Sequence, residues 1–361
     1  MNSARPNAED LAALVRAGLL APSGDNCQPW RFAWAGGRLS VVLDAVRAAS
    51  LYDVRHTASW MALGALLTNV RLSARARGLE TSVELFPSDH PPAAARLNFR
   101  PGLDAAGPLW EAVPRRCVNR RPYRPGPLPA PFQAELAEAA DVPGVRLDLA
   151  AEEPVRGRLA ALAARNDRIL FENRALHDGL YRWLRWSPRE AEASGDGIPA
   201  ASLELGTLEG AGFRLLAAWP LSRALGAARL TAALEVRSRA RYRRSAAIGL
   251  LSLDGTRPED FVRGGEALQR LWLTTTHRGL AFQPITGIVC LLLRCRLARG
   301  EGLSTPHRAQ VETAGRALER LLPGAAGRTP CLLFRVGEAP APSGRAPRRA
   351  ADAVLTVEAN G

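Results

Sequence analysis

Residues 21–30 read APSGDNCQPW, and they separate a predicted helix from a predicted strand. Apolar residues recur at helical spacing over residues 8–20, and the Pro, Gly, Asp and Asn that follow are typical of a turn that ends a helix. The side chains of Ser23, Asn26 and Gln28 offer hydrogen-bond donors and acceptors without charge, which suits the polar edge of a heteroaromatic ring. An ordinary Asn-rich turn is the alternative interpretation of this spacing.

The rest of the chain mixes helical and strand patterns without a visible internal repeat. Residues 57–78 and 258–278 predict long helices, and residues 206–244 predict a helical insertion. A Pro-rich loop and a short helix are expected to close the chain. Strands are expected over residues 30–34, 39–43, 83–86, 246–253 and 331–336.

The length of 361 residues exceeds the size at which one hydrophobic core usually keeps growing, so two units are expected. A Pro- and Ala-rich stretch at 87–107 is expected to cross between them. We therefore place an N-terminal half at 1–107 and a C-terminal half at 108–361, with residues 206–244 as a possible lid. No G-x-G-x-x-G follows a strand, which disfavours a Rossmann domain. The expected fold class is α+β, with helices around antiparallel-rich sheets.

The formal net charge is +13, and all 48 basic residues are arginine. Such a charge can favour nucleic acid, but no nucleic-acid-binding motif and no interleaving of basic and aromatic residues accompanies it. A coding bias toward Arg, Ala, Gly and Pro explains the charge better, so no nucleic-acid partner is expected. Without lysine no Schiff base can form, and any phosphate must be held by arginine, hydroxyls or backbone amides.

Five cysteines are scattered without a Cys-x-x-Cys pair or a His cluster, so neither a disulfide framework nor a metal site is expected. The first residues lack a basic segment followed by a continuous apolar core, and no run of 18 apolar residues occurs. We therefore expect a cytoplasmic protein without a membrane partner.

The opening stretch resembles the P-S-x-x-N-x-Q-P-W segment of the FMN-dependent nitroreductase family. In that family the segment reaches the flavin across a dimer interface, which implies that Pro22, Ser23, Asn26 and Gln28 lie beside the isoalloxazine ring or the ribityl chain. The family also places a helical Asn beside the flavin, and Asn69 in GALLTNV matches it. An amide on the helix surface is the alternative for that residue.

A second segment, RRCVNRRPY at 115–123, resembles the family's opening R-R-S-x-R-x-F motif, which holds the FMN phosphate and contacts the pyrimidine edge of the ring. The resemblance implies flavin contacts for Arg116, Cys117, Asn119 and Arg120. The two arginines are four residues apart, so from one face of a helix they could reach a single anion. Cys117 stands where the family has Ser or Thr, which puts one hydrogen bond to FMN in doubt. A solvated arginine cluster is the alternative.

Two later segments extend the resemblance. SGRAPRR at 343–349 is similar to the family's terminal basic cluster, which implies that Arg345 or Arg348 binds the phosphate. GLAFQPITG at 279–287 is similar to a G-L-x-x-x-P-x-x-G loop that lies against the flavin N5 edge. The residues of this loop that inherit the contact are Pro284, Ile285, Thr286 and Gly287.

The order of the segments carries a further implication. In ordinary family members R-R-S-x-R precedes P-S-x-x-N-x-Q-P-W within one subunit, and each site borrows the second segment from the partner subunit. Here the order is reversed and neither segment is repeated. The resemblance therefore implies two half-domains fused into a pseudo-dimer with one FMN between them, as a monomer or a homodimer of pseudo-dimers.

The function that the resemblance implies is an FMN-dependent oxidoreductase, which uses NAD(P)H to reduce a nitroaromatic, a quinone or a similar small-molecule acceptor. The flavin performs the chemistry in such proteins, so no catalytic side chain and no metal ligand is expected. A flavin-sequestering protein and a specialised biosynthetic dehydrogenase are alternatives on the same fold. A basic nucleic-acid-binding protein is a remote alternative.

Overall fold

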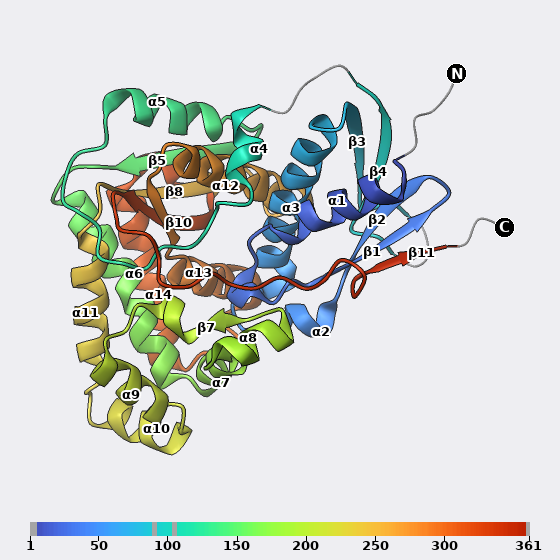
Figure 1. Cartoon of the computed structure of the whole chain (residues 1–361). Helices are drawn as coiled ribbons and strands as arrows, with labels where there is room; N and C mark the ends of the chain where they lie inside the picture. Colours follow the sequence, from blue (N-terminus) through green and yellow to red (C-terminus); the bar gives the residue numbers. More distant parts are fainter. Residues whose placement is uncertain (1–5, 89–91, 103–106, 359–361) are drawn as a thin grey trace.

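The computed structural model describes residues 6–88, 92–102 and 107–358, and it contains two main sheets (Figure 1). The first sheet has the strand order β11-β1-β2-β4-β3. Neighbouring strands in it are antiparallel, except that β11 runs parallel to β1. The strands are β1 (Trp30–Ala35), β2 (Arg38–Leu43), β3 (Leu79–Leu85), β4 (Ala95–Pro101) and β11 (Leu355–Val357).

The β1–β2 hairpin forms where the sequence predicts it. Gly36 and Gly37 have φ values of 56° and 76° in its turn, a conformation that glycine adopts without strain. Trp30 and Phe32 alternate onto one face and are 2% and 1% exposed. They pack there against α1 (Ala8–Leu19) and α3 (Thr57–Arg75), so the first core lies between this sheet and two helices.

The second sheet has the antiparallel order β5-β8-β10-β9. Alternate residues of β8 join different cores: Leu251 packs on the α12 side, and Leu250 packs on the side of α6, α13 and α14. Because helices cover both faces, every residue of β8 is buried. The predicted α+β class with antiparallel-rich sheets is thus confirmed. The elements are β5 (Val145–Ala150), β8 (Ala247–Leu253), β9 (Ala281–Pro284), β10 (Thr329–Gly337), α6 (Val155–Glu172), α12 (Pro258–His277), α13 (Gly287–Ala298) and α14 (Thr305–Leu321).

The two sheets are joined through α3 and α12, which pack against each other between them (Figure 1). A Cβ atom on Gly64 of α3 would lie 2.0 Å from the carbonyl oxygen of Val262. A Cβ atom on Gly265 of α12 would lie 1.9 Å from the carbonyl oxygen of Met61. The helices therefore meet backbone to backbone, and only glycine fits at these two positions.

Residues 206–244 are helical, as the sequence predicts: they form α9 (Thr207–Leu215), α10 (Trp219–Ala227) and α11 (Ala232–Arg243). α11 packs along α6, whereas α9 and α10 form a corner of the molecule far from the first sheet (Figure 1). Among the described residues, none of the helices has the length and apolar character needed to cross a bilayer. The other elements are α2 (Ala45–Ala48), α4 (Pro108–Ala112), α5 (Ala130–Ala139), α7 (Arg174–Trp183), α8 (Pro188–Ser194), the short strands β6 (Leu184–Arg185) and β7 (Ile198–Pro199), and the 3₁₀ turns at Gly24–Asn26, Val54–His56, Ala200–Leu203 and Pro323–Ala325.

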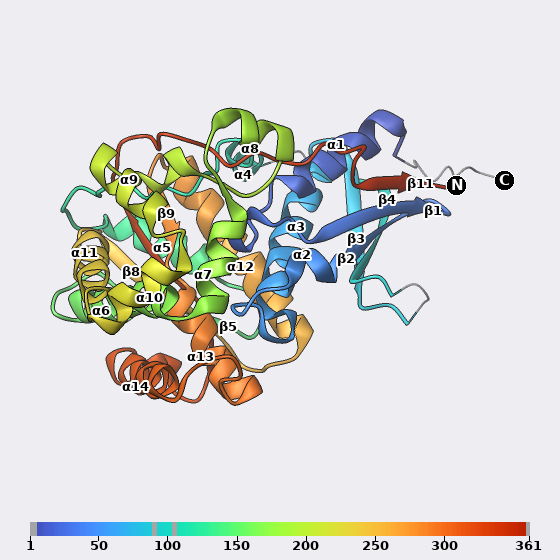
Figure 2. The ribbon, with the colours of Figure 1, turned by 90° about the horizontal axis from the view of Figure 1, so that it is seen from below.

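The Pro- and Ala-rich stretch contains strand β4, which the sequence did not predict. The expectation of a short helix after the last Pro-rich loop is wrong, because strand β11 lies there instead. Both strands are stabilised by partners distant in sequence: Leu97 pairs with Leu39, and Leu355 pairs with Phe32. Figure 2 shows the C-terminal segment crossing from the second sheet to the first, so the end of the chain belongs to the N-terminal sheet.

Candidate functional site

A cavity of about 410 Å³ lies between the two halves of the chain. This volume falls within the range of small-molecule sites, and most of its walls are apolar. Residues 22–62 supply one side, and residues of the C-terminal half from Val118 to Leu332 supply the other. The cavity therefore depends on both halves.

The turn that follows α1 forms one wall. The hydroxyl oxygen of Ser23 accepts a hydrogen bond from the backbone N–H of Gln28 at 2.9 Å, which closes the turn. Asp25, Asn26 and Gln28 have φ values of 49°, 55° and 47°, a region that non-glycine residues rarely adopt. Ser23 and Asp25 line the cavity, whereas Asn26 and Gln28 do not.

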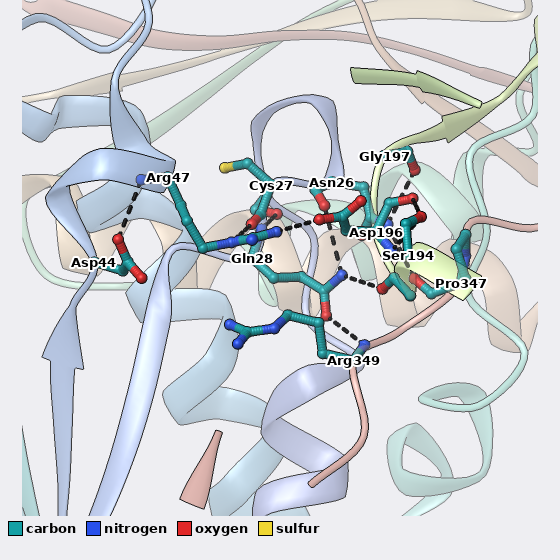
Figure 3. Close-up of polar contacts among 12 residues, drawn as sticks. Asn26, Cys27, Gln28, Asp44, Arg47, Ser194, Asp196, Gly197, Pro347 and Arg349 are labelled. Atoms are coloured by element: carbon teal, nitrogen blue, oxygen red, sulfur yellow. Dashed lines mark hydrogen bonds and ion pairs between the residues drawn. The ribbon is translucent and has the colours of Figure 1, made fainter. Parts of the chain in front are cut away.

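The side chain of Asn26 braces the turn against two distant segments (Figure 3). Its Nδ2 donates to the carbonyl oxygens of Gly197 at 3.1 Å and Pro347 at 2.9 Å. Its Oδ1 accepts from Arg348 at 2.9 Å. All of the strong hydrogen-bonding groups of this amide are thus engaged within the protein.

Gln28 has the same kind of role and is fully buried. Its Nε2 donates to the carbonyl oxygen of Gly195 at 2.9 Å, and its Oε1 accepts from the backbone N–H of Arg349 at 3.0 Å (Figure 3). The two amides therefore connect the turn, the loop before β7 and the C-terminal segment.

Asp196 adds an ionic link at the same corner (Figure 3). Its carboxylate pairs with Arg47 from the N-terminal half and with Arg185 at 2.5 Å from the C-terminal half. Burial raises the pKa of Asp196, but the hydrogen bonds and charges of the two arginines outweigh burial and hold the pKa below its usual value. Arg47 also donates to the carbonyl oxygen of Cys27 at 2.7 Å and lines the cavity.

The start of α3 forms a second wall. The carboxylate of Asp53 accepts from the backbone N–H groups of Ala58 at 2.8 Å and Ser59 at 3.1 Å, and from the Ser59 hydroxyl at 2.6 Å. Arg55 and His56, immediately before the helix, have φ values of 50° and 60°. The segments that build the cavity walls therefore contain unfavourable backbone conformations, which commonly occur at functional sites.

Asn69 lies outside the cavity lining, fully buried between three helices. Its Nδ2 donates to the carbonyl oxygen of Ala17 at 3.0 Å, and its Oδ1 accepts from Gln269 at 2.7 Å. It thus joins α1, α3 and α12.

The loop at 284–287 ends β9 and begins α13, and all four of its residues line the cavity. The backbone N–H of Ile285 donates to the carbonyl oxygen of Leu333 at 2.8 Å, which holds the loop on β10. A Cβ atom on Gly287 would lie 2.3 Å from the Asn166 side chain, so a larger residue here would displace the Asn166 amide.

Residues 116–129 form no helix, so the expectation that Arg116 and Arg120 share one helical face is wrong. A Pro-rich sequence that cannot continue α4 explains the extended path. Arg116 is 6% exposed, donates to the carbonyl oxygen of Leu20 at 2.8 Å and lies 4.4 Å from the ring centre of Trp272. Arg120 lines the cavity and donates to the carbonyl oxygen of Ser202 at 3.2 Å.

Cys117 and Asn119 attach this segment to the C-terminal segment. The thiol of Cys117 lies 3.7 Å from the carbonyl oxygen of Gly344, and the Asn119 amide donates to the carbonyl oxygen of Pro340 at 2.8 Å. Neither side chain lines the cavity.

Three arginines from these two segments lie close together. Arg116, Arg345 and Arg348 form no ion pair in the described part of the chain. Burial, together with the charges of the other two, lowers the pKa of Arg116 to about 9, and burial together with Arg345 lowers that of Arg348 to about 10. The Nε atoms of Arg116 and Arg348 are buried without a hydrogen-bond partner.

A polar cluster in the cavity was not predicted from the sequence. The Tyr52 hydroxyl donates to Asn166 at 2.9 Å, and the Tyr242 hydroxyl donates to Asp167 at 3.1 Å. Burial raises the pKa of Asp167. These residues come from the loop before α3, from α6 and from α11, and no motif marks them.

The predicted site residues thus divide into two groups. Those that line the cavity are Pro22, Ser23, Arg120, Pro284, Ile285, Thr286 and Gly287. Those that lie outside its lining are Asn26, Gln28, Asn69, Arg116, Cys117, Asn119, Arg345 and Arg348. Within the residues that the structure describes, no group of His, Cys, Asp and Glu could hold a metal ion.

No known protein-family model matches the chain. A protein of Mycobacterium tuberculosis (strain CDC 1551 / Oshkosh) named "Uncharacterized protein MT1398" is 32% identical over 351 residues, which cover 94% of this chain and 47% of that protein. The chain therefore spans about half the length of that relative. "Putative NAD(P)H nitroreductase acg" of M. tuberculosis (strain ATCC 25618 / H37Rv) is 26% identical over 356 residues, which cover 97% of this chain and 96% of that protein.

Solved structures similar to the chain include the FMN-dependent nitroreductase NfnB from Mycobacterium smegmatis in complex with NADPH. Its TM-score is 0.39 at 16% identity, over 70% of this chain and 98% of that one. A nitroreductase with bound FMN from Desulfitobacterium hafniense DCB-2 has a TM-score of 0.36 at 11% identity, over 69% of this chain and 97% of that one. The resemblance to nitroreductases that the motifs predict is confirmed by the nearly full-length similarity to the acg protein.

Proposed function

We propose that this chain is an FMN-dependent oxidoreductase of the nitroreductase type, with the flavin ring in the cavity between its two halves. One observation carries the proposal: the turn at 22–28 and the loop at 284–287 contribute to the walls of the same cavity, although they lie near opposite ends of the chain. Both were expected at a flavin from their sequences. The apolar walls suit a flat heteroaromatic ring.

The group formed by Arg116, Arg345 and Arg348 fits a phosphate. Three like charges without a carboxylate partner repel one another, and two of their buried Nε atoms lack an acceptor. A phosphate would neutralise this charge and accept charge-assisted hydrogen bonds. Arg116 packs on Trp272, which is a residue of the cavity wall, so the group adjoins the cavity. We assign the phosphate to this group and the ring to the cavity.

Bound FMN supplies the two-electron chemistry that connects NAD(P)H with a nitroaromatic, a quinone or a similar acceptor. The chain's own residues bind and orient the ring, and the apolar walls exclude water. In this proposal residues 1–107 and 108–361 are two half-domains that share one site. Residues 206–244 act as a lid, because Tyr242 of α11 reaches the cavity wall.

Reconstitution of the full chain with FMN tests the proposal. We expect FMN added to the apoprotein to bind with a shifted visible spectrum, and anaerobic NADH or NADPH to bleach the flavin absorbance. A nitroaromatic or a quinone should then restore the absorbance. Absence of FMN binding at micromolar concentrations would contradict the proposal.

A second candidate is a protein that sequesters flavin. The observation that favours it is that the cavity lining includes Leu180, Trp183, Leu203 and Tyr242, and in this candidate their segments cover the cavity. A cover that stays closed would leave no access for NAD(P)H or an acceptor. Tight FMN binding without acceptor-stimulated NAD(P)H oxidation would support this candidate over the first.

A further inference from the structure

Three aspartates line the cavity, and two of them have protein partners. Asp53 accepts three hydrogen bonds at the start of α3, and Asp167 accepts hydrogen bonds from Tyr242 and Asn166. Asp25 has no hydrogen-bond or ion-pair partner among the described residues. Its carboxylate is therefore the one of the three that is left for a ligand.

The backbone holds Asp25 in the cavity wall. Its φ and ψ of 49° and 20° are left-handed, a conformation that Asp tolerates better than most residues. The hydrogen bond between Ser23 and Gln28 joins the residues that flank Asp25 and so closes the turn around it. Burial raises the pKa of Asp25 to about 6, and the charge of Arg120 opposes this rise. At pH 7 the carboxylate is thus largely ionised and able to accept hydrogen bonds.

The two arginines that line the cavity also differ in how fully their guanidinium groups are bonded within the protein. Arg47 is bonded to Asp196 and to the carbonyl oxygen of Cys27. Arg120 donates a single hydrogen bond, to Ser202, and forms no ion pair with Asp25 in the described structure. Since a guanidinium has five N–H donors, Arg120 keeps donors for a ligand close to the unpaired carboxylate.

We propose that Asp25 accepts a hydrogen bond from the imide N3–H of the flavin ring, while Arg120 donates to a neighbouring ring carbonyl. The assignment rests on the proposed function. The pyrimidine edge of the ring presents an N–H between two carbonyl groups, and an ionised carboxylate can only accept, so Asp25 matches the N–H alone. Asn69, which the resemblance places beside the flavin, has both ends of its amide bonded within the protein.

Titration of the full-length apoprotein with FMN and with N3-methyl-FMN tests the assignment, with binding followed by flavin fluorescence. The methyl group replaces the hydrogen atom of the proposed donor. We expect the wild-type chain to bind FMN about ten- to a hundred-fold more tightly than the methylated compound. Asp25→Ala should bind the two compounds about equally, and Asp25→Asn, which suits the left-handed backbone, should show a reduced difference.

Asp167→Asn is the matched control, because it makes the same change in a cavity carboxyl that already has protein partners. It should keep the wild-type preference for FMN. Failure of the wild-type chain to bind FMN would overturn the proposed function. Normal FMN binding with an unchanged preference in a folded Asp25→Ala chain would overturn the role of Asp25 and leave the proposed function standing. Unfolding temperatures of all variants establish that they are folded.

Discussion

Asn26 and Gln28 were predicted to contact a flavin, but the structure directs their side chains into the protein. A buried amide must find partners for its donors and acceptor, and here these come from residues near 195 and near 348. We infer that both residues position the turn. The groups of the turn that face the cavity are those of Ser23 and Asp25.

Asp196 provides a pH-dependent prediction at the same corner. We expect Asp196→Asn to lower the free energy of unfolding by about 1–3 kcal/mol at pH 7, because it weakens charge-assisted bonds from Arg47 and Arg185. The pKa of Asp196 is lowered in the folded chain. The wild-type carboxylate therefore stabilises the fold above its unfolded pKa of about 3.9, and this contribution is lost as the pH falls through the folded value.

Urea unfolding from pH 7 downward measures this difference, which should narrow below about pH 4. The control is Glu312→Gln, since Glu312 pairs with Arg308 on the exposed surface, and its loss should change the free energy of unfolding by less than about 0.5 kcal/mol. If the difference in free energy of unfolding between the wild-type chain and Asp196→Asn stays constant with pH, Asp196 has no ionic role.

The arginine group provides a prediction that separates phosphate binding from ring binding. We expect Arg116→Gln and Arg348→Gln each to weaken FMN binding about ten- to a hundred-fold, because each removes a charge-assisted hydrogen bond worth roughly 1.5–3 kcal/mol. Riboflavin lacks the phosphate, so its affinity should change little. Titration with both ligands provides the comparison, and equal losses for both would place the phosphate elsewhere.

At the scale of elements, the contact between α3 and α12 decides how the halves fit together. Gly64 and Gly265 let the two backbones approach, and the hydrogen bond between Asn69 and Gln269 sets their register. An apolar contact alone would allow the helices to slide, whereas the hydrogen bond from Gln269 to Asn69 forms in one alignment.

We expect Gly64→Ala and Gly265→Ala each to destabilise the chain by at least about 2 kcal/mol, because the new methyl group meets a backbone carbonyl that cannot move without separating the helices. Gly210→Ala in α9 is the control. Nothing lies within 4 Å of its added Cβ, so it should be neutral or stabilise by up to about 1 kcal/mol. Thermal or urea unfolding measures all three, and full stability of the first two would show that the helices can separate freely.

At the scale of the whole molecule, two features connect the halves of the chain. The cavity takes one wall from each half, and the C-terminal segment returns to the first sheet through β11 (Figure 2). The halves are thus connected both by the chain itself and by a strand that ends in the opposite sheet.

We expect FMN to bind at one molecule per chain, with a ratio that does not depend on protein concentration, because each chain contributes both walls of one cavity. Isothermal titration of the apoprotein at two protein concentrations measures the ratio. A value near two would show a second site in each chain, and a value that falls on dilution would point to sites shared between chains.

The sequence by itself determined the elements whose signals are local. Apolar spacing and turn residues, which are local signals, predict three of these elements. They are the helix before residue 21, the β1–β2 hairpin with its Gly-Gly turn, and the buried strand β8. The motifs also predicted that the turn at 22–28 and the loop at 284–287 lie at one flavin, and residues of both line one cavity. Short-range periodicity and the chemistry of turn residues need no knowledge of distant partners.

Only the tertiary structure decided which side chains face the cavity. β4 and β11 exist because distant strands pair with them. Asn26, Gln28 and Asn69 do not line the cavity, and their amides bond to distant carbonyl groups instead. The unpaired carboxylate of Asp25 likewise becomes visible only when the partners of the other cavity aspartates are known. A hydrogen bond between residues far apart in sequence leaves no local pattern, so the direction of a polar side chain is settled by the fold.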